Sequence, residues 1–333
     1  MSANEDGRRK STTTQQLLAA RARTGFGMLE GSFLGAHERF WRLDHLLTKL
    51  GPNADRELYR YFPVSAIAAL EGHFKQAAAA IVNSGPIYME RGLNLAKDRL
   101  KNSLDLIPVL HDKTITVGEL VAHWLPFSTL AHIESAIGGL LDLNFKQAAK
   151  TAVEPSAGRN ALSDQEPIVA DVASLWRQIA EAFETRHILA HEVASSFDVT
   201  FQMAKDAVDG CSKLATVIEA VIWHTAWKDV PLTQYEMNAV EEEKSRASRQ
   251  RLAALMRTAR RVATRAKRGS MLRRNHFAWR QTTRELVEMS TSEFTGGSIF
   301  PMLVSSGFHI ATTARCQAIE EWVSLADPEG SRI

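Results

Sequence analysis

The chain has 333 residues, which is long for one hydrophobic core and short for three, so two domains are expected. Its 45% hydrophobic and 23% charged residues, with a formal net charge of +2, are typical of globular proteins and exclude an intrinsically disordered chain. The two cysteines, Cys211 and Cys316, lie far apart, which excludes a Cys-x-x-Cys metal knuckle and a disulfide framework.

The N-terminal segment 1–16 is polar and basic and has no apolar region of the kind found in signal peptides, so it predicts a flexible tail, extending over 1–24. No stretch of about eighteen uncharged apolar residues is present to cross a bilayer. Together with cysteines that suit a reducing compartment, these features predict a soluble, cytoplasmic protein without a membrane partner.

Beyond the tail, almost every segment repeats apolar residues with the period of a helix, and none alternates apolar and polar residues as strands do. The sequence therefore predicts an all-α fold. Thr116-x-x-Glu119 is a capping box that marks the start of one helix. A loop is expected over 154–167, which contains two prolines and a glycine. The helices expected in the first domain before this loop are, in chain order, 28–50, 64–83, 116–124, 132–141 and 145–151.

The segment 186–192 reads RHILAHE and combines a permanent cation, two imidazoles and a carboxylate. A helical apolar stripe precedes it over 175–183 and another follows from residue 207, so the motif is expected between two helices or on a bend that joins them. On a continuous helix, Arg186 and His191 point about 140° apart. To serve one phosphate they would need a break in the helix or a second copy across a two-fold interface.

The spacing of Arg186 and His191, Arg-x-x-x-x-His, resembles the motif of the HEPN ribonucleases. Other runs within residues 55–228 resemble helices of that family, namely RYFPVS at 60–65, ALEGHF at 69–74, GELVAH at 118–123 and DLNF at 142–145. The resemblance implies a helical bundle that cleaves RNA without a metal or other cofactor, usually as a dimer that brings two motifs together. It also implies a role as a toxin or in defence against phage.

The resemblance further implies roles for individual residues. Arg186 would hold the scissile phosphate and stabilise its developing charge, which suits a planar donor that is always ionised. His191 would transfer protons, because imidazole titrates near neutral pH, and His187 would face the same way. Glu71 would orient or balance them. Where many members have a polar amide this chain has Glu192, which would either repel the substrate or hold His187 or Arg186 in place.

A metal site is the alternative for the same histidines. His187 and His191 are four residues apart and share a helical face, so they could bind zinc with further ligands from Glu71, His123 or His132. The sequence contains no His-Glu-x-x-His, and helical histidines are common, so no metal and no cofactor are expected. The remaining histidines are expected to be structural, including His37, His45 and His224.

The second domain is expected after a break at 228–231, where Thr233-x-x-Glu236 forms another capping box. Residues 244–284 contain fourteen lysines and arginines and no acidic residue, so the remainder of a chain that nets +2 carries −12. An inert surface normally mixes both signs, so this run predicts a helix that binds a polyanion or an acidic partner, the alternative being a solvated face. The arginines expected to bind RNA are Arg257, Arg260, Arg261, Arg265 and Arg268, beside an apolar stripe of Leu252, Leu255, Ala259, Val262 and Ala266.

Four short runs occur in order within residues 232–325: Gln234-x-Glu236-Met237-Asn238, Ala278-Trp279, GGSI at 296–299 with Pro301-Met302, and Thr312-x-x-Arg315. In their order and spacing these runs resemble the LprI-type lysozyme-inhibitor family. The positions at which that family has cysteines are Val240, Val287 and Gly307 here. The disulfides of the secreted relatives cannot form, so a cytoplasmic adaptation of that fold is expected instead of periplasmic lysozyme inhibition.

These features predict a tail over 1–24, a HEPN-like domain over 25–228 and a basic helical domain over 229–333. The expected function is a metal-independent endoribonuclease that uses 2′-hydroxyl attack and acts as a homodimer on RNA, with an antitoxin or regulatory protein as a further partner. The alternative is a non-catalytic HEPN-like module that binds RNA or protein or serves dimerisation. An open groove faced by Arg186 and His191 would favour catalysis, and burial of both residues in salt bridges would favour the alternative.

Overall fold

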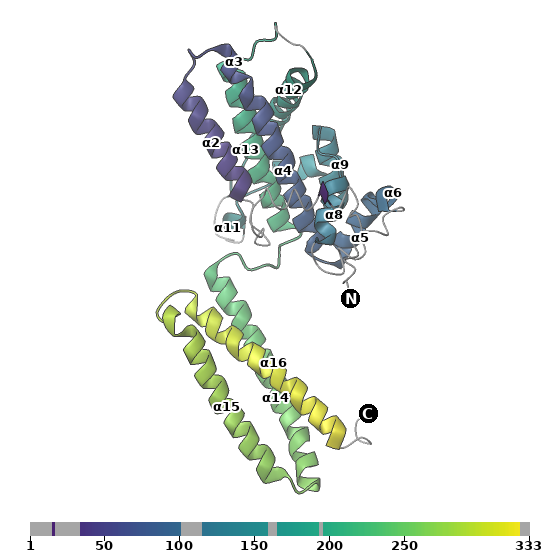
Figure 1. The fold of residues 1–333 in the computed structure, drawn as a ribbon, viewed down its shortest axis with the longest axis vertical. Coiled ribbons are helices and arrows are strands. Elements are labelled where there is room, and N and C mark those ends of the chain that lie inside the picture. The colour runs from purple at the N-terminus through teal and green to yellow at the C-terminus, as the bar shows by residue number, and fades with distance from the viewer. Residues whose placement is uncertain (1–14, 17–33, 101–114, 159–164, 193–195, 327–333) are drawn as a thin grey trace, which may run out of the picture. The chain divides into compact units, whose positions relative to one another are not determined.

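The computed structural model describes residues 15–16, 34–100, 115–158, 165–192 and 196–326, so most of the tail expected over 1–24 lies outside the described residues. The described chain is all-α, which confirms the fold class, and no strand occurs in it (Figure 1). No described helix has both the length and the apolar character needed to cross a membrane. The chain divides into two compact units, Met1–Lys228 and Asp229–Ile333.

Unit 1 is organised around α4 (Tyr61–Asn83), whose buried residues include a run of small alanines that lets neighbouring helices approach closely. The five helices that pack on α4 most extensively are α2 (Leu34–Leu50), α5 (Pro86–Leu95), α8 (Val117–Trp124), α12 (Val172–His191) and α13 (Phe201–His224) (Figure 1). The remaining described helices of unit 1 are α3 (Arg56–Tyr59), α6 (Lys97–Leu100), α9 (Leu130–Leu141), α10 (Phe145–Lys150) and α11 (Pro155–Gly158).

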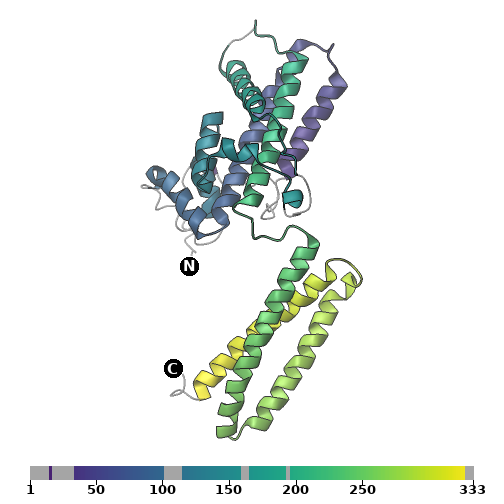
Figure 2. The same cartoon turned by 180° about the vertical axis from the view of Figure 1, so that it is seen from behind.

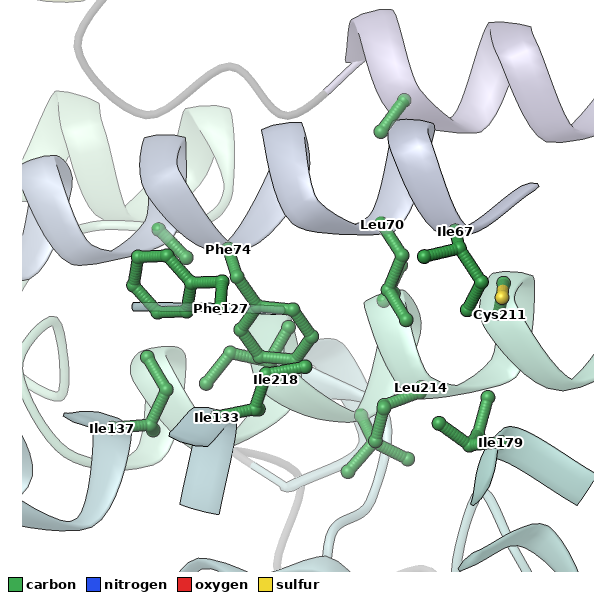
Figure 3. Packing of buried hydrophobic residues seen from close by; sticks show 14 of the residues in the cluster. Ile67, Leu70, Phe74, Phe127, Ile133, Ile137, Ile179, Cys211, Leu214 and Ile218 are labelled. Atoms are coloured by element: carbon green, nitrogen blue, oxygen red, sulfur yellow. The ribbon is translucent and has the colours of Figure 1, made fainter. Parts of the chain in front are cut away.

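The core between α4 and α13 consists of aliphatic and aromatic side chains that are almost completely buried (Figure 3). The ring of Phe74 on α4 lies 6.2 Å from that of Phe127 and 6.2 Å from that of Phe145. On the α8 side, the backbones come so close that a Cβ on Gly118 would lie 2.3 Å from the carbonyl oxygen of Ala79. Apolar burial and this close approach together fix the position of α4, which carries Glu71.

Both capping boxes expected from the sequence are present. The amide of Glu119 donates to the Thr116 hydroxyl at 3.1 Å, and the amide of Thr116 donates to the Glu119 carboxylate at 2.7 Å. The same exchange joins Thr233 and Glu236 at 3.2 and 3.1 Å. Each box satisfies backbone N–H groups that the first turn of a helix leaves without an intrahelical partner.

Several expected element boundaries are wrong. α4 begins at Tyr61 and not after Pro63, because a proline in the first turn removes no hydrogen bond that the helix needs. The four-residue helix α11 lies within the loop expected over 154–167, of which 159–164 are outside the described residues. For the helix expected over 28–50, residues 28–33 lie outside the described residues, and α2 covers the rest as Leu34–Leu50.

Unit 2 consists of α14 (Gln234–Arg265), α15 (Gly269–Thr291), the 3-10 turn η2 (Ser292–Phe294) and α16 (Phe300–Ala326). α14 and α15 run in opposite directions, and α16 packs against both (Figure 2). The basic run 244–284 was expected to form one helix. It is divided between α14 and α15, because the chain reverses after α14. Lys267, with φ of 54°, occupies the reversal in the left-handed region.

The core of unit 2 is small and contains two of the expected stripe residues, Leu252 and Ala259, with Leu255 packed at its edge. Ala266, expected in the same stripe, is exposed at the end of α14. Val287 of α15 lies against Gly307 of α16, where a Cβ on the glycine would come within 3.0 Å of Val287 Cγ2. Two of the positions that hold cysteines in the lysozyme-inhibitor family are thus neighbours in space.

Candidate functional site

The Arg-x-x-x-x-His motif occupies the last turns of α12, which continues without a break to His191. The carboxylate of Asp171 caps the start of this helix by accepting from the amide of Ser174 at 3.0 Å, and the helix ends because Glu192 takes an extended conformation. The expectation that the motif lies between two helices or on a bend that joins them is therefore wrong, because the motif forms the end of one continuous helix. Arg186 and His191 diverge by about 140° around one continuous helix.

Arg186 faces α4, where its Nη2 lies 3.9 Å from Oε1 of Glu71. Both side chains are partly buried, with 30% of Arg186 and 23% of Glu71 exposed. The distance is too long for a hydrogen bond, and Oε1 of Glu71 accepts none from any described residue. Glu71 thus attracts Arg186 by charge without occupying its donors, and no other described residue accepts a hydrogen bond from them.

The two histidines of the motif lie at the surface. His187 and His191 are both exposed, and their ring centroids are 5.0 Å apart at an angle of 51°. Their common face is separate from the side of α12 that packs Arg186 against Glu71. The structure therefore brings Glu71 and Arg186 together, and His187 and His191 together, but it does not join the two pairs within one chain.

The alternative metal site is not assembled in the part of the chain that the structure describes, where no group of three or more His, Cys, Asp or Glu side chains could hold a metal ion. Glu71 approaches Arg186 and not the two motif histidines. His132 is engaged elsewhere, with its Nδ1 3.2 Å from the Ser128 hydroxyl. The pKa of His123 is lowered, mainly by burial and to a smaller extent by the positive charge of Lys75.

A second polar cluster, not expected from the sequence, lies between α2, α4 and α13. Oε1 of Glu219 is 2.6 Å from Nε2 of His37 and 3.6 Å from Nε2 of His73. The hydrogen bond to Glu219 raises the pKa of His37, against an opposing effect of burial. Burial lowers the pKa of His73 to about 3, with a smaller contribution from repulsion by His37. No motif in the sequence links these residues, because each comes from a different helix.

The five arginines expected to bind RNA are all exposed on unit 2. Arg257, Arg260, Arg261 and Arg265 lie on α14, and Arg268 follows the reversal that ends it. The expected apolar stripe faces inward except at Ala266, so the separation of basic and apolar faces on α14 agrees with its sequence pattern. Exposure leaves these cations accessible to a polyanion.

Comparison of the chain with models of protein families, with curated proteins and with solved structures gives no match.

Proposed function

We propose that the protein is a metal-independent endoribonuclease whose active site uses Glu71, Arg186, His187 and His191. The observation that carries the proposal is that Arg186 lies partly exposed beside Glu71, with no hydrogen bond from its donors to a described residue, while His191 is exposed on the same helix. Burial of the motif in salt bridges would have favoured a structural role, and only the charge pair with Glu71 is present among the described residues.

In this reaction the 2′-hydroxyl of one ribose attacks the adjacent phosphorus and the bond from phosphorus to the 5′-oxygen breaks. His191 accepts the proton of the 2′-hydroxyl or delivers one to the departing 5′-oxygen, and a second imidazole performs the other transfer. Arg186 donates to the phosphate oxygens, whose negative charge rises in the transition state. The products are a 2′,3′-cyclic phosphate and a 5′-hydroxyl, which balances the protons without a metal.

The continuous α12 supports a dimeric site. A phosphate bound at Arg186 cannot also meet His191 of the same helix, because the two side chains diverge by about 140°. A second copy related by a two-fold axis would bring its own His191 to that phosphate. We therefore propose a homodimer, with RNA as substrate and with an antitoxin or regulatory protein as a further partner in a toxin or phage-defence setting.

The test is incubation of the protein with mixed RNA, in the presence and absence of a chelator, followed by analysis of the new ends. Cleavage in chelator that leaves a cyclic phosphate and a 5′-hydroxyl is the expected result. Arg186→Ala should abolish it, whereas Arg177→Ala, an exposed arginine of the same helix outside the motif, should not. Cleavage that requires a divalent cation, or no cleavage at all, overturns the proposal.

A second candidate is a non-catalytic RNA-binding protein, and the exposed arginines of unit 2 favour it. It would bind RNA at low salt with the affinity that counterion release provides, yet leave the RNA intact. Binding without new 5′-hydroxyl ends therefore distinguishes it from the endoribonuclease.

A further inference from the structure

An open groove of about 870 Å³ lies within unit 2 between α14 and α15, with α16 contributing Phe308 and Thr312. Its apolar surface includes Leu252, Met256 and Phe308. Arginines from two helices also line the groove, namely Arg249, Arg257 and Arg260 of α14 and Arg280 and Arg284 of α15. The reversal at Lys267 thus turns one basic stretch of sequence into two facing walls.

The positive charge of the groove is not neutralised by the protein. No acidic residue lines it. Among the described residues, Arg257, Arg260, Arg280 and Arg284 form no ion pair, whereas other cations of the unit do: Lys244 with Glu241, Arg246 with Glu243 and Arg251 with Glu320. Arginines gathered without carboxylates repel one another, and an anion with several oxygens would relieve that repulsion through charge-assisted hydrogen bonds.

Aromatic side chains stand among these cations. The rings of His276 and Trp279 stack with centroids 5.3 Å apart and an angle of 22°, and the guanidinium of Arg315 lies 5.6 Å from the Trp279 ring. Nδ1 of His276 and Nε of Arg315 are buried and have no hydrogen-bond partner among the described residues. Burial lowers the pKa of His276, and the charges of Arg315, Arg280 and Arg260 lower it further. The groove therefore combines the aromatic rings of His276 and Trp279, which line it, with a positive field.

We propose that this groove binds single-stranded RNA, with phosphates on Arg257, Arg260 and Arg280 and bases stacked at Trp279. Single strands fit this chemistry because their bases are free to stack on aromatic and guanidinium groups, whereas those of a duplex are not. An acidic peptide would match the charge but would make no use of Trp279. The choice of RNA among polyanions rests on the proposed ribonuclease function.

The groove also separates the arginines of unit 2 into two classes. Arg257 and Arg260 line it, whereas Arg261, Arg265 and Arg268 do not. A general electrostatic surface would draw on both classes equally. A groove that follows an RNA strand would draw chiefly on the first class and on Arg280, which faces it from the other helix.

The test measures binding of a fluorescein-labelled single-stranded RNA of mixed sequence, about twelve nucleotides long and so within the range of single-strand sites, across a series of salt concentrations. All variants are full-length chains that also carry His191→Ala, so that binding is measured without cleavage. Arg257→Gln, Arg260→Gln and Arg280→Gln combined should weaken binding at least tenfold and lower the salt slope by about 2, near 0.7 for each lost phosphate contact. The matched control, Arg246→Gln with Arg273→Gln and Arg274→Gln, removes three exposed arginines of the same unit that do not line the groove, and it should change affinity by less than about threefold.

Trp279→Leu should weaken binding at least fivefold while the salt slope stays the same, and Trp279→Phe should restore it, because phenylalanine keeps an aromatic face. The Phe variant keeps the test valid if the Leu variant unfolds. Equal losses from the two arginine triples, no loss from Trp279→Leu, or tighter binding of duplex RNA or of polyglutamate overturns the proposal. Binding by the groove in a wild-type chain that cuts no RNA would instead refute only the ribonuclease.

Discussion

Glu219 of α13 lies between two histidines whose pKa values shift in opposite directions. His37 accepts a proton more readily in the folded chain because it gains a hydrogen bond to this carboxylate. His73 resists protonation because it is buried among apolar side chains. The cluster links the folding of unit 1 to pH both below and above the ordinary histidine pKa of 6.5.

The first prediction concerns this link. The folded pKa of His73, about 3, lies below its unfolded value of 6.5, so its contribution to stability is complete above pH 6.5 and is lost as the pH falls toward 3. For His37 the folded pKa is raised, so its contribution is complete below 6.5 and is lost as the pH rises through the folded value. Urea unfolding as a function of pH should show a flatter acid limb in His73→Gln and a flatter alkaline limb in His37→Gln. Unchanged limbs in both variants would contradict the assignment.

A second prediction at the residue scale concerns His191. Its replacement by alanine should lower RNA cleavage at least about a hundredfold, the usual consequence of losing a proton-transfer group. The free energy of unfolding should hardly change, because the side chain is exposed. His45→Ala is the control, since His45 is also exposed but stacks on Trp41 outside the motif. Normal cleavage by the His191 variant would show that this imidazole is not the acid or the base.

At the scale of elements, the contact of α4 with α8 gives a matched pair of glycine substitutions. Gly118→Ala would place a Cβ 2.3 Å from a backbone oxygen of α4, and forced repacking of this kind costs about 1–3 kcal/mol. Gly72→Ala meets nothing within 4 Å on the exposed side of α4 and should stabilise the helix by about 0.5–1 kcal/mol. Calorimetric melting temperatures should therefore move in opposite directions. A melting temperature that rises in the Gly118→Ala variant as well would show that the packing of α8 on α4 is looser than described.

How much of the fold follows from the sequence depends on how local each signal is. The capping boxes at Thr116 and Thr233 were predictable because the hydrogen bonds join residues three apart. The reversal at Lys267 was not, because the nearby Gly269 begins α15 instead of occupying the left-handed position, and the helical period continues into the reversal. The fold places a lysine in the left-handed region there, which the sequence pattern alone does not reveal.

In the candidate site, too, features that depend on local sequence could be predicted, and those that depend on tertiary packing could not. Arg186 and His191 are close in sequence, so their divergence around a helix could be computed in advance. Glu71 was identified only through a family resemblance, and the 3.9 Å approach to Arg186 depends on how α4 and α12 pack. Glu219 and the facing arginines of the groove could not be found from sequence, because tertiary packing and the turn at Lys267 bring their partners together.

On the scale of the whole molecule, the proposed site predicts that two defective chains repair each other. Arg186→Ala and His191→Ala homodimers should both be inactive. A mixed dimer keeps one intact site, so an equimolar mixture should recover about a quarter of wild-type cleavage after subunit exchange. Light scattering should give twice the 37.0 kDa of one chain. A monomer at micromolar concentration, or a dimer whose mixtures stay inactive, would mean that the site does not span two chains.

Each unit also buries one thiol: Cys211 within unit 1 and Cys316 within unit 2, both 0% exposed. Burial raises the pKa of each thiol, and alkylating reagents attack thiolates, so neither cysteine should react until its own unit opens. Alkylation of each cysteine therefore reports the opening of the unit that buries it. Because the buried core of unit 2 is much the smaller, mass spectrometry during rising urea should find Cys316 modified first. The difference between the urea concentrations at which Cys316 and Cys211 become modified would then measure how independently the two units unfold.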